Sequence, residues 1–135
     1  MILIFGGAYQ GKLGYARDNF KIETVFDCSK ELDRGVEPDE SELPEPDLST
    51  DAIIGLEVFV LACTKSGIEA ADWFRERRDK WQDKILIIQD QSQGIVPIDA
   101  EQRAAREMNG RLMIYLAGEA DEVHRVFCSI GKRLK

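Results

Sequence analysis

The chain opens with MILIFGGAYQGKL, residues 1–13, and this stretch gives the strongest indication of the fold. A short, wholly apolar run that ends in glycines and then a lysine is typical of a buried parallel strand, a turn and the start of a helix. Gly6, Gly11 and Lys12 satisfy the spacing G-x-x-x-x-G-K of a phosphate-binding loop. In such a loop, backbone N–H groups surround the phosphate oxygens and the lysine adds a positive charge.

The last position of this motif departs from the pattern. Leu13 stands where a serine or threonine would bind Mg²⁺, and a leucine side chain offers no metal ligand. A glycine-rich turn between a first strand and a first helix also occurs in α/β proteins that bind no phosphate, because glycine permits tight turns and close packing. The loop by itself leaves both a phosphate site and a purely structural turn open.

Length and charge narrow the classes of protein. At 135 residues the chain is long enough to bury a core, and we expect a single domain over residues 1–135. Its 18 basic and 25 acidic residues give a net charge of −7, which argues against nucleic acid or an anionic membrane as the main partner. No apolar run approaches the roughly 18 residues of a membrane span, and the first apolar run is too short for a signal peptide. We therefore expect a cytoplasmic protein with no membrane span.

The hydrophobic pattern predicts alternating strands and helices. Strands are expected at residues 1–5, 24–27, 84–90 and 121–128, the last at the edge of the sheet and followed by a basic tail. Helices are expected at residues 12–20, 49–64, 68–82 and about 100–116, with Ser49 and Asp99 as N-caps of the second and fourth. Residues 33–50 are rich in acids and prolines and contain no lysine, so an exposed acidic loop is expected there.

Two acids follow predicted strands and are candidate Mg²⁺ ligands. Asp90 ends the apolar run 84–90, as in the acid-terminated strand that supplies a Mg²⁺ contact in phosphate-loop nucleotidases. Asp27 ends the strand at 24–27. In open α/β sheets ligands bind at the carboxyl ends of the strands, and the sequence does not choose between these two acids.

Two arginines and one histidine remain as candidates near the C-terminus. Arg103 and Arg106 lie one helical turn apart, so they project in similar directions, either toward an anion or toward surface acids such as Glu107. His124 is the only histidine of the chain. Its place on the strand at 121–128 favours an exposed or packing residue over a catalytic one.

Two segments together resemble the CobU-type family of bifunctional adenosylcobinamide kinases and adenosylcobinamide-phosphate guanylyltransferases of cobalamin biosynthesis. The first segment is the opening MILIFGGA-x-x-GK. The second contains Gly94-Ile-Val-Pro97, Arg103, Arg106, Glu107, Gly110, Ala120-Asp-Glu-Val123 and Ile130-Gly-Lys-Arg-Leu-Lys135. The resemblance covers roughly residues 1–20 and 83–135, with a weaker match around residues 56–64.

The resemblance implies a shortened P-loop-type three-layer α/β fold with a mainly parallel central sheet, and a homo-oligomer that is often a trimer. It also implies phosphorylation of the aminopropanol hydroxyl of adenosylcobinamide, then GMP transfer from GTP through a histidine-linked intermediate. Asp90 would stand where the family has a glutamate, and Lys12 and Asp90 would serve catalysis. The residues implied in nucleotide binding are Gly6, Gly7, Ala8, Gly11, Lys12, Leu13, Arg103 and Arg106; those implied in metal binding are Asp27 and Asp90.

The departures from the family limit the expected chemistry. Leu13 weakens any Mg²⁺ site, Ser92 replaces a glycine, and Met113 and Ile114 replace a polar pair. The segment that should carry the histidine nucleophile is shortened, and no histidine precedes His124. We expect a GTP- or ATP-binding protein of corrinoid metabolism that keeps a kinase step without histidine-dependent guanylyl transfer. The alternative is a noncatalytic accessory or regulatory protein that binds a nucleotide or a corrinoid.

Overall fold

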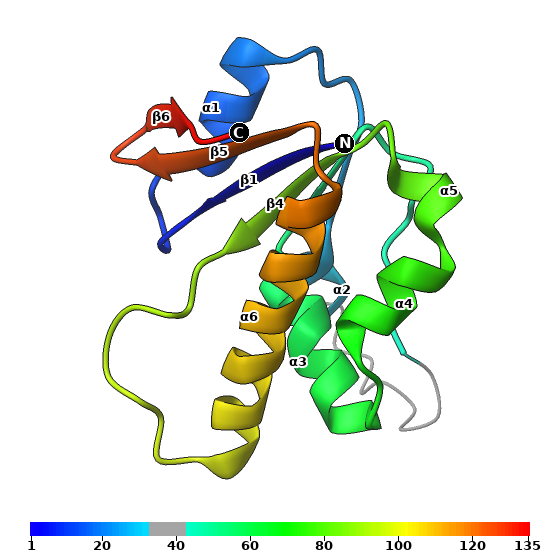
Figure 1. Ribbon diagram of the computed structural model, residues 1–135, viewed down its shortest axis with the longest axis vertical. Coiled ribbons are helices and arrows are strands. Elements are labelled where there is room, and N and C mark those ends of the chain that lie inside the picture. Colours follow the sequence, from blue (N-terminus) through cyan, green and yellow to red (C-terminus); the bar gives the residue numbers. More distant parts are fainter. Residues whose placement is uncertain (33–42) are drawn as a thin grey trace.

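The computed structural model describes residues 1–32 and 43–135, which form a six-stranded sheet with helices on both faces (Figure 1). The strands are β1 (Ile2–Gly6), β2 (Val25–Asp27), β3 (Ala52–Ile54), β4 (Ile85–Gln89), β5 (Glu122–Phe127) and β6 (Ile130–Arg133). The helices are α1 (Lys12–Asn19), α2 (Cys28–Leu32), α3 (Leu56–Ser66), α4 (Ala70–Glu76), α5 (Arg78–Trp81) and α6 (Ala100–Glu119). The sheet order is β2-β3-β4-β1-β5-β6. The strands β1 to β5 run parallel and β6 runs antiparallel to β5, so the expected mainly parallel α/β sheet is confirmed.

The two central strands are apolar on both faces because helices cover both sides of the sheet. On one face Leu3 and Leu86 pack with residues of α3, α4 and α6, among them Phe59. On the other face Ile4 and Ile87 pack with residues of α1. This double burial explains why residues 1–5 and 84–90 could be recognised as central strands from their uninterrupted apolar runs.

The predicted helix at residues 49–64 is wrong in its first half. Residues 52–54 form the strand β3, which pairs with β2 and β4, and the helix α3 begins only at Leu56. Gly55, with φ 72° in the left-handed region, separates the two elements. The apolar spacing of this stretch fits a helical period, but its first apolar residues are buried inside the sheet. Ser49 is not an N-cap; its backbone N–H donates to Asp47 Oδ1 at 2.9 Å in a turn.

The predicted strand at residues 121–128 is confirmed as β5, but its predicted position at the edge of the sheet is wrong. β5 lies between β1 and β6, and β6 forms the edge of the sheet where a basic tail was expected. Cys128 and Ser129, with φ 50° and φ 63°, make the tight turn between the two strands. The hydrophobic pattern does not reveal the hairpin, because β6 contains only one large apolar residue, Ile130.

The other predicted helices and the predicted acidic loop agree with the structure in part. The predicted helix at residues 68–82 divides at Arg77 into α4 and α5, and α6 begins after Asp99, whose side chain accepts a hydrogen bond from Glu101 N at 2.8 Å. Residues 33–42 of the predicted acidic loop lie outside the described part of the chain. Over residues 43–50 the chain is not simply exposed, because Pro46 is buried and Leu43 packs against the core. No helix in the described part is long and apolar enough to cross a membrane.

Candidate functional site

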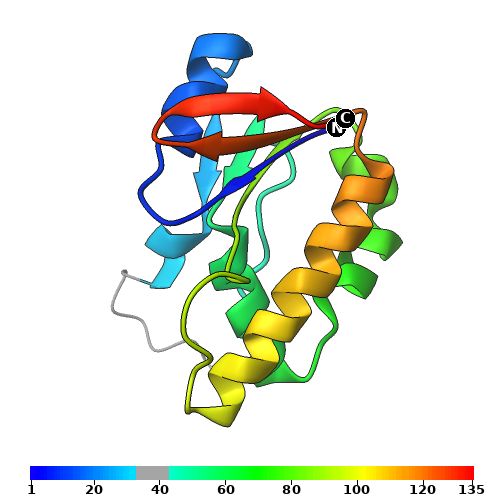
Figure 2. The same ribbon diagram turned by 60° about the vertical axis from the view of Figure 1, so that its left-hand side comes forward.

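The adjacent strands β1 and β4 continue into opposite layers of the fold. β1 leads into α1 on one face of the sheet, whereas β4 leads through residues 90–99 into α6 on the other face (Figure 2). Where two neighbouring connections diverge in this way, the carboxyl edge of the sheet opens into a crevice. A pocket of about 600 Å³ lies there. It is lined by Gly7, Ala8, Glu57, Val58, Leu61, Gln89, Asp90, Gln91, Gln93, Ile95, Pro97, Gln102, Ala105 and Arg106.

Two glycines of the predicted phosphate loop are required by close packing. A Cβ atom at Gly6 would lie 2.3 Å from the carbonyl oxygen of Val126, because β1 and β5 approach closely at this point. Gly11 has φ 82°, and a Cβ atom there would lie 2.2 Å from Ser129 Oγ. These glycines therefore have a structural role that is independent of any ligand.

The loop is fixed to the turn between β5 and β6. The backbone oxygen of Gln10 accepts from Ser129 N at 2.8 Å, and Gln10 Oε1 accepts from Cys128 N at 2.7 Å. Among the described residues, no side-chain hydrogen bond caps the start of α1 at Gly11, which leaves its N-terminal N–H groups available to an anion. Leu13 is half-buried and packs with the apolar cluster between α1 and the sheet.

Lys12 folds back over the loop. Its Nζ donates to the carbonyl oxygen of Gly7 at 2.6 Å. Partial burial lowers the pKa of Lys12, and the charge of the nearby Glu57 carboxylate opposes that effect. Lys12 therefore lies beside the pocket residue Gly7, but it does not itself line the pocket.

Glu57 is a pocket residue that the sequence analysis missed. It lies in the first turn of α3, and its Oε2 accepts a hydrogen bond from Gln89 N at 2.9 Å. Glu57 and Asp90 follow the adjacent strands β3 and β4 and line the same pocket. The available signal was the run Ala52-Ile-Ile54 followed by Gly55, which is the same strand-then-glycine pattern as in β1; assigning residues 49–64 to one helix concealed it.

The two acids predicted as metal ligands are not brought together. Asp90 lines the pocket, and its Oδ1 accepts from Ser92 N at 2.8 Å. Asp27 ends β2, which β3 separates from β4, and its Oδ1 accepts from Ser29 N at 3.0 Å and Ser29 Oγ at 2.6 Å. Asp27 therefore supports the start of α2 rather than the pocket. Within residues 1–32 and 43–135, no three His, Cys, Asp or Glu side chains are grouped to hold a metal ion.

The two predicted arginines bind the connection between β4 and α6. Arg106 donates to the carbonyl oxygens of Ser92 at 2.7 Å and Ile95 at 3.3 Å. Arg103 donates to the carbonyl oxygens of Pro97, at 3.0 Å, and of Ile98. Arg106 also lines the pocket. The alternative of a surface pairing with an acid such as Glu107 is not formed among the described residues, because both side chains bind carbonyl groups of the connection.

His124 is buried, and both of its ring nitrogens have partners. Nδ1 lies 2.9 Å from the hydroxyl oxygen of Tyr15, and Nε2 lies 2.7 Å from Glu122 Oε2. The contact with Tyr15 connects α1 to β5, and the contact with Glu122 lies within β5. They agree with the interpretation of His124 as a packing residue.

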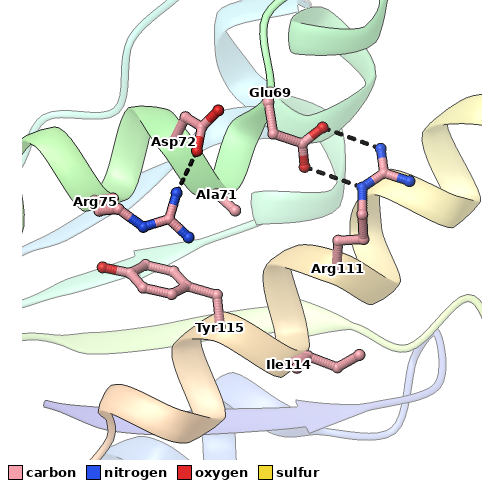
Figure 3. A pocket seen from close by; sticks show the side chains of 7 residues that line it. All are labelled: Glu69, Ala71, Asp72, Arg75, Arg111, Ile114 and Tyr115. Carbon is pink, nitrogen blue, oxygen red and sulfur yellow. Dashed lines mark hydrogen bonds and ion pairs between the residues drawn. The ribbon is translucent and has the colours of Figure 1, made fainter.

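A second hollow of about 480 Å³ lies between α4 and α6 (Figure 3). Its charged side chains satisfy one another: Arg111 binds Glu69 through two hydrogen bonds of 3.2 and 3.0 Å. Arg75 binds Asp72 and lies 4.8 Å from the centre of the Tyr115 ring. Since the ionic groups are already paired, this hollow is a weaker candidate for a ligand site than the crevice at the carboxyl edge.

Together these features define an α/β protein with a crevice at the carboxyl edge of a parallel sheet, bordered by a glycine loop, two carboxylates and an arginine. No known protein-family model matches the chain, and no curated protein sequence matches it. The resemblance to the adenosylcobinamide kinase family therefore rests on residues 1–20 and 83–135, with a weaker match around residues 56–64.

Proposed function

We propose that this protein binds GTP or ATP in the crevice between the glycine loop and α6. The observation that carries the proposal is the pocket of about 600 Å³ in which Gly7 and Ala8 of the loop meet Asp90 and Arg106. Lys12 supplies positive charge to the phosphates, and the uncapped start of α1 supplies N–H donors. A crevice at the carboxyl edge of a parallel sheet is the usual ligand site of this architecture.

We propose that a divalent cation binds with the nucleotide at the two acids that line this pocket. Asp90 is our first candidate ligand, and Glu57 replaces Asp27 as the second because it lines the same pocket. Bound Mg²⁺ would neutralise charge on the phosphate oxygens. Leu13 offers no ligand, so we expect a weaker requirement for Mg²⁺ than in a loop that carries a hydroxyl group.

We further propose that the protein keeps the kinase step of the adenosylcobinamide kinase family that it resembles, with a corrinoid hydroxyl group as the phosphoryl acceptor. Histidine-dependent guanylyl transfer has no support in the contacts of this chain. A covalent histidine intermediate needs a ring nitrogen that can attack phosphorus, whereas both nitrogens of the single histidine, His124, are engaged by Tyr15 and Glu122.

The second candidate function is nucleotide or corrinoid binding without catalysis. It is favoured by the contacts of Arg103 and Arg106, which hold backbone carbonyl groups and would have to release them before they could stabilise a transferring phosphoryl group. Binding tolerates such a loss better than catalysis, because the loop and Lys12 also act on the ground state.

Calorimetric titration of the protein with GTP and with ATP, each with and without Mg²⁺, tests the proposal. We expect binding that Lys12→Ala abolishes and that Lys21→Ala, an exposed lysine paired with Glu23 at the surface, leaves unchanged. Absence of binding to both nucleotides would overturn the proposal. If binding occurs, turnover with adenosylcobinamide separates the kinase from the noncatalytic candidate.

A further inference from the structure

The hairpin of β5 and β6 exposes one face of the sheet. Phe127 opposes Ile130, and Arg125 opposes Lys132, in the register of the two strands. Because side chains alternate along a strand, these four residues share one face. The exposed fractions of Phe127 and Ile130 are 65% and 74%. On the opposite face Tyr15 of α1 covers Gly131, where a Cβ atom would lie 2.0 Å from the tyrosine ring.

No described helix covers the exposed face. Val123, earlier on β5 and on the same side of the strand, packs in the core cluster that contains residues of α6. Beyond it, the hairpin extends past α6 in both views (Figures 1 and 2). β6 is the last strand of the sheet, so its outer backbone groups face no other described strand.

The charges on this face are unbalanced. Like charges directly opposite each other on paired strands are destabilising, and Arg125 and Lys132 are such a pair. Neither side chain forms an ion pair with an acid of residues 1–32 or 43–135. Two unpaired cations next to an exposed apolar pair fit a partner that brings negative charge and an apolar side chain together.

We propose that the free edge of β6 binds an extended acidic segment of a partner protein, which adds to the sheet as a further strand. Its backbone would pair with β6, an acidic side chain would lie beside Lys132, and an apolar side chain would lie beside Ile130. Because strand side chains alternate, the acidic and the apolar residue of the partner are two positions apart. This proposal is independent of nucleotide binding.

Two other occupants fit the observations less well. A second copy that paired β6 with β6 would bring the basic side chains of the two strands together, which edge strands use to prevent self-association. Nucleic acid could contact the two cations, but it has no peptide backbone to pair with the open edge of β6. An acidic polypeptide matches the apolar pair, the cations and the open strand edge at once.

An amide NMR titration with a ten-residue peptide tests the proposal. Threonine occupies every other position of the peptide, and glutamate and isoleucine alternate at the positions between. We expect saturable shift changes at Ile130 and Lys132. Lys132→Glu should weaken binding about tenfold, whereas the matched reversal Lys80→Glu, at an exposed lysine of α5, should not change it. A peptide with lysine in place of glutamate, and one with N-methylated amides on the pairing side, should not bind.

Three results of the titration would overturn the proposal, and a fourth comes from sedimentation. They are shift changes that map away from β6, equal binding by the glutamate and lysine peptides, and equal effects of Lys132→Glu and Lys80→Glu. Sedimentation of the protein alone provides a further check. A homo-oligomer that Lys132→Glu dissociates would show that the edge binds another copy, which also contradicts an acidic partner.

Discussion

Glu57 Oε2 accepts a hydrogen bond from the backbone N–H of Gln89 at 2.9 Å, and this bond joins the start of α3 to the end of β4. The same carboxylate raises the pKa of Lys12 against the lowering effect of burial. One side chain therefore links the loop after β1, the end of β4 and the helix after β3. It bonds directly to the end of β4 and acts on the loop after β1 through its charge alone.

Replacing Glu57 should separate its hydrogen-bonding role from its charge. Glu57→Ala removes the acceptor of Gln89 N and should lower the free energy of unfolding by about 1 kcal/mol. Glu57→Gln keeps an oxygen acceptor and should recover most of that loss, but it removes the charge, so the pKa of Lys12 should fall further. Urea denaturation and NMR titration of the Lys12 side chain measure the two effects. Equal stability of both variants and the wild type would contradict this role.

Gly6 should tolerate no side chain. Gly6→Ala places a Cβ atom 2.3 Å from the Val126 carbonyl oxygen, and the paired backbones must move apart, at a cost of at least about 2 kcal/mol. Gly14→Ala is the matched control in α1, where nothing lies within 4 Å of an added Cβ atom. It should instead stabilise the protein by about 0.5–1 kcal/mol. Thermal unfolding of both variants checks the opposite signs.

The contact between Tyr15 and His124 should stabilise the attachment of α1. Tyr15→Phe keeps the ring and removes the hydroxyl group that lies 2.9 Å from His124 Nδ1, so stability should fall by about 1 kcal/mol. Tyr9→Phe removes a hydroxyl group from an exposed ring and should leave stability unchanged. If the two variants unfold at the same denaturant concentration, the hydrogen bond contributes nothing measurable.

Asp51 should make folding sensitive to acid. Its carboxylate accepts hydrogen bonds from Thr24 N and Glu23 N, both at 2.9 Å, and these bonds lower the pKa of Asp51. A group whose pKa is lowered by folding contributes its full stabilisation above the pKa of the unfolded side chain, and that contribution is lost as the pH falls through the folded pKa. Melting temperature measured against pH should therefore decline more steeply in the wild type than in Asp51→Asn. Parallel declines would contradict the assignment.

Arg106 should hold the connection between β4 and α6 in place. Arg106→Ala frees the carbonyl oxygens of Ser92 and Ile95, and amide hydrogen exchange over residues 91–98 should become about fivefold faster, the equivalent of about 1 kcal/mol. Arg111 lies on the same helix but binds Glu69, so Arg111→Ala is the matched control. It should leave exchange in this segment unchanged, as mass spectrometry of the exchanged peptides can establish.

The elements with local signals could be predicted from the amino-acid sequence. Uninterrupted apolar runs identified β1 and β4, since a strand covered on both faces needs no polar residue. The glycines and Lys12 marked the turn into α1, and Asp99 marked the start of α6. These features depend on backbone conformation and on neighbours along the chain, which a single sequence displays directly.

Which of these residues lie together depends on the order of the strands in the sheet. Asp27 and Asp90 look equivalent in sequence, but the strand order places β3 between their strands and leaves only Asp90 in the pocket. Glu57 enters the pocket because the short run Ala52–Ile54 becomes a strand, which its apolar spacing could not distinguish from a helix. β6 pairs because β5 offers it a free edge. Each outcome depends on strand pairing between residues far apart in the chain, and that pairing leaves no periodic signal in the sequence.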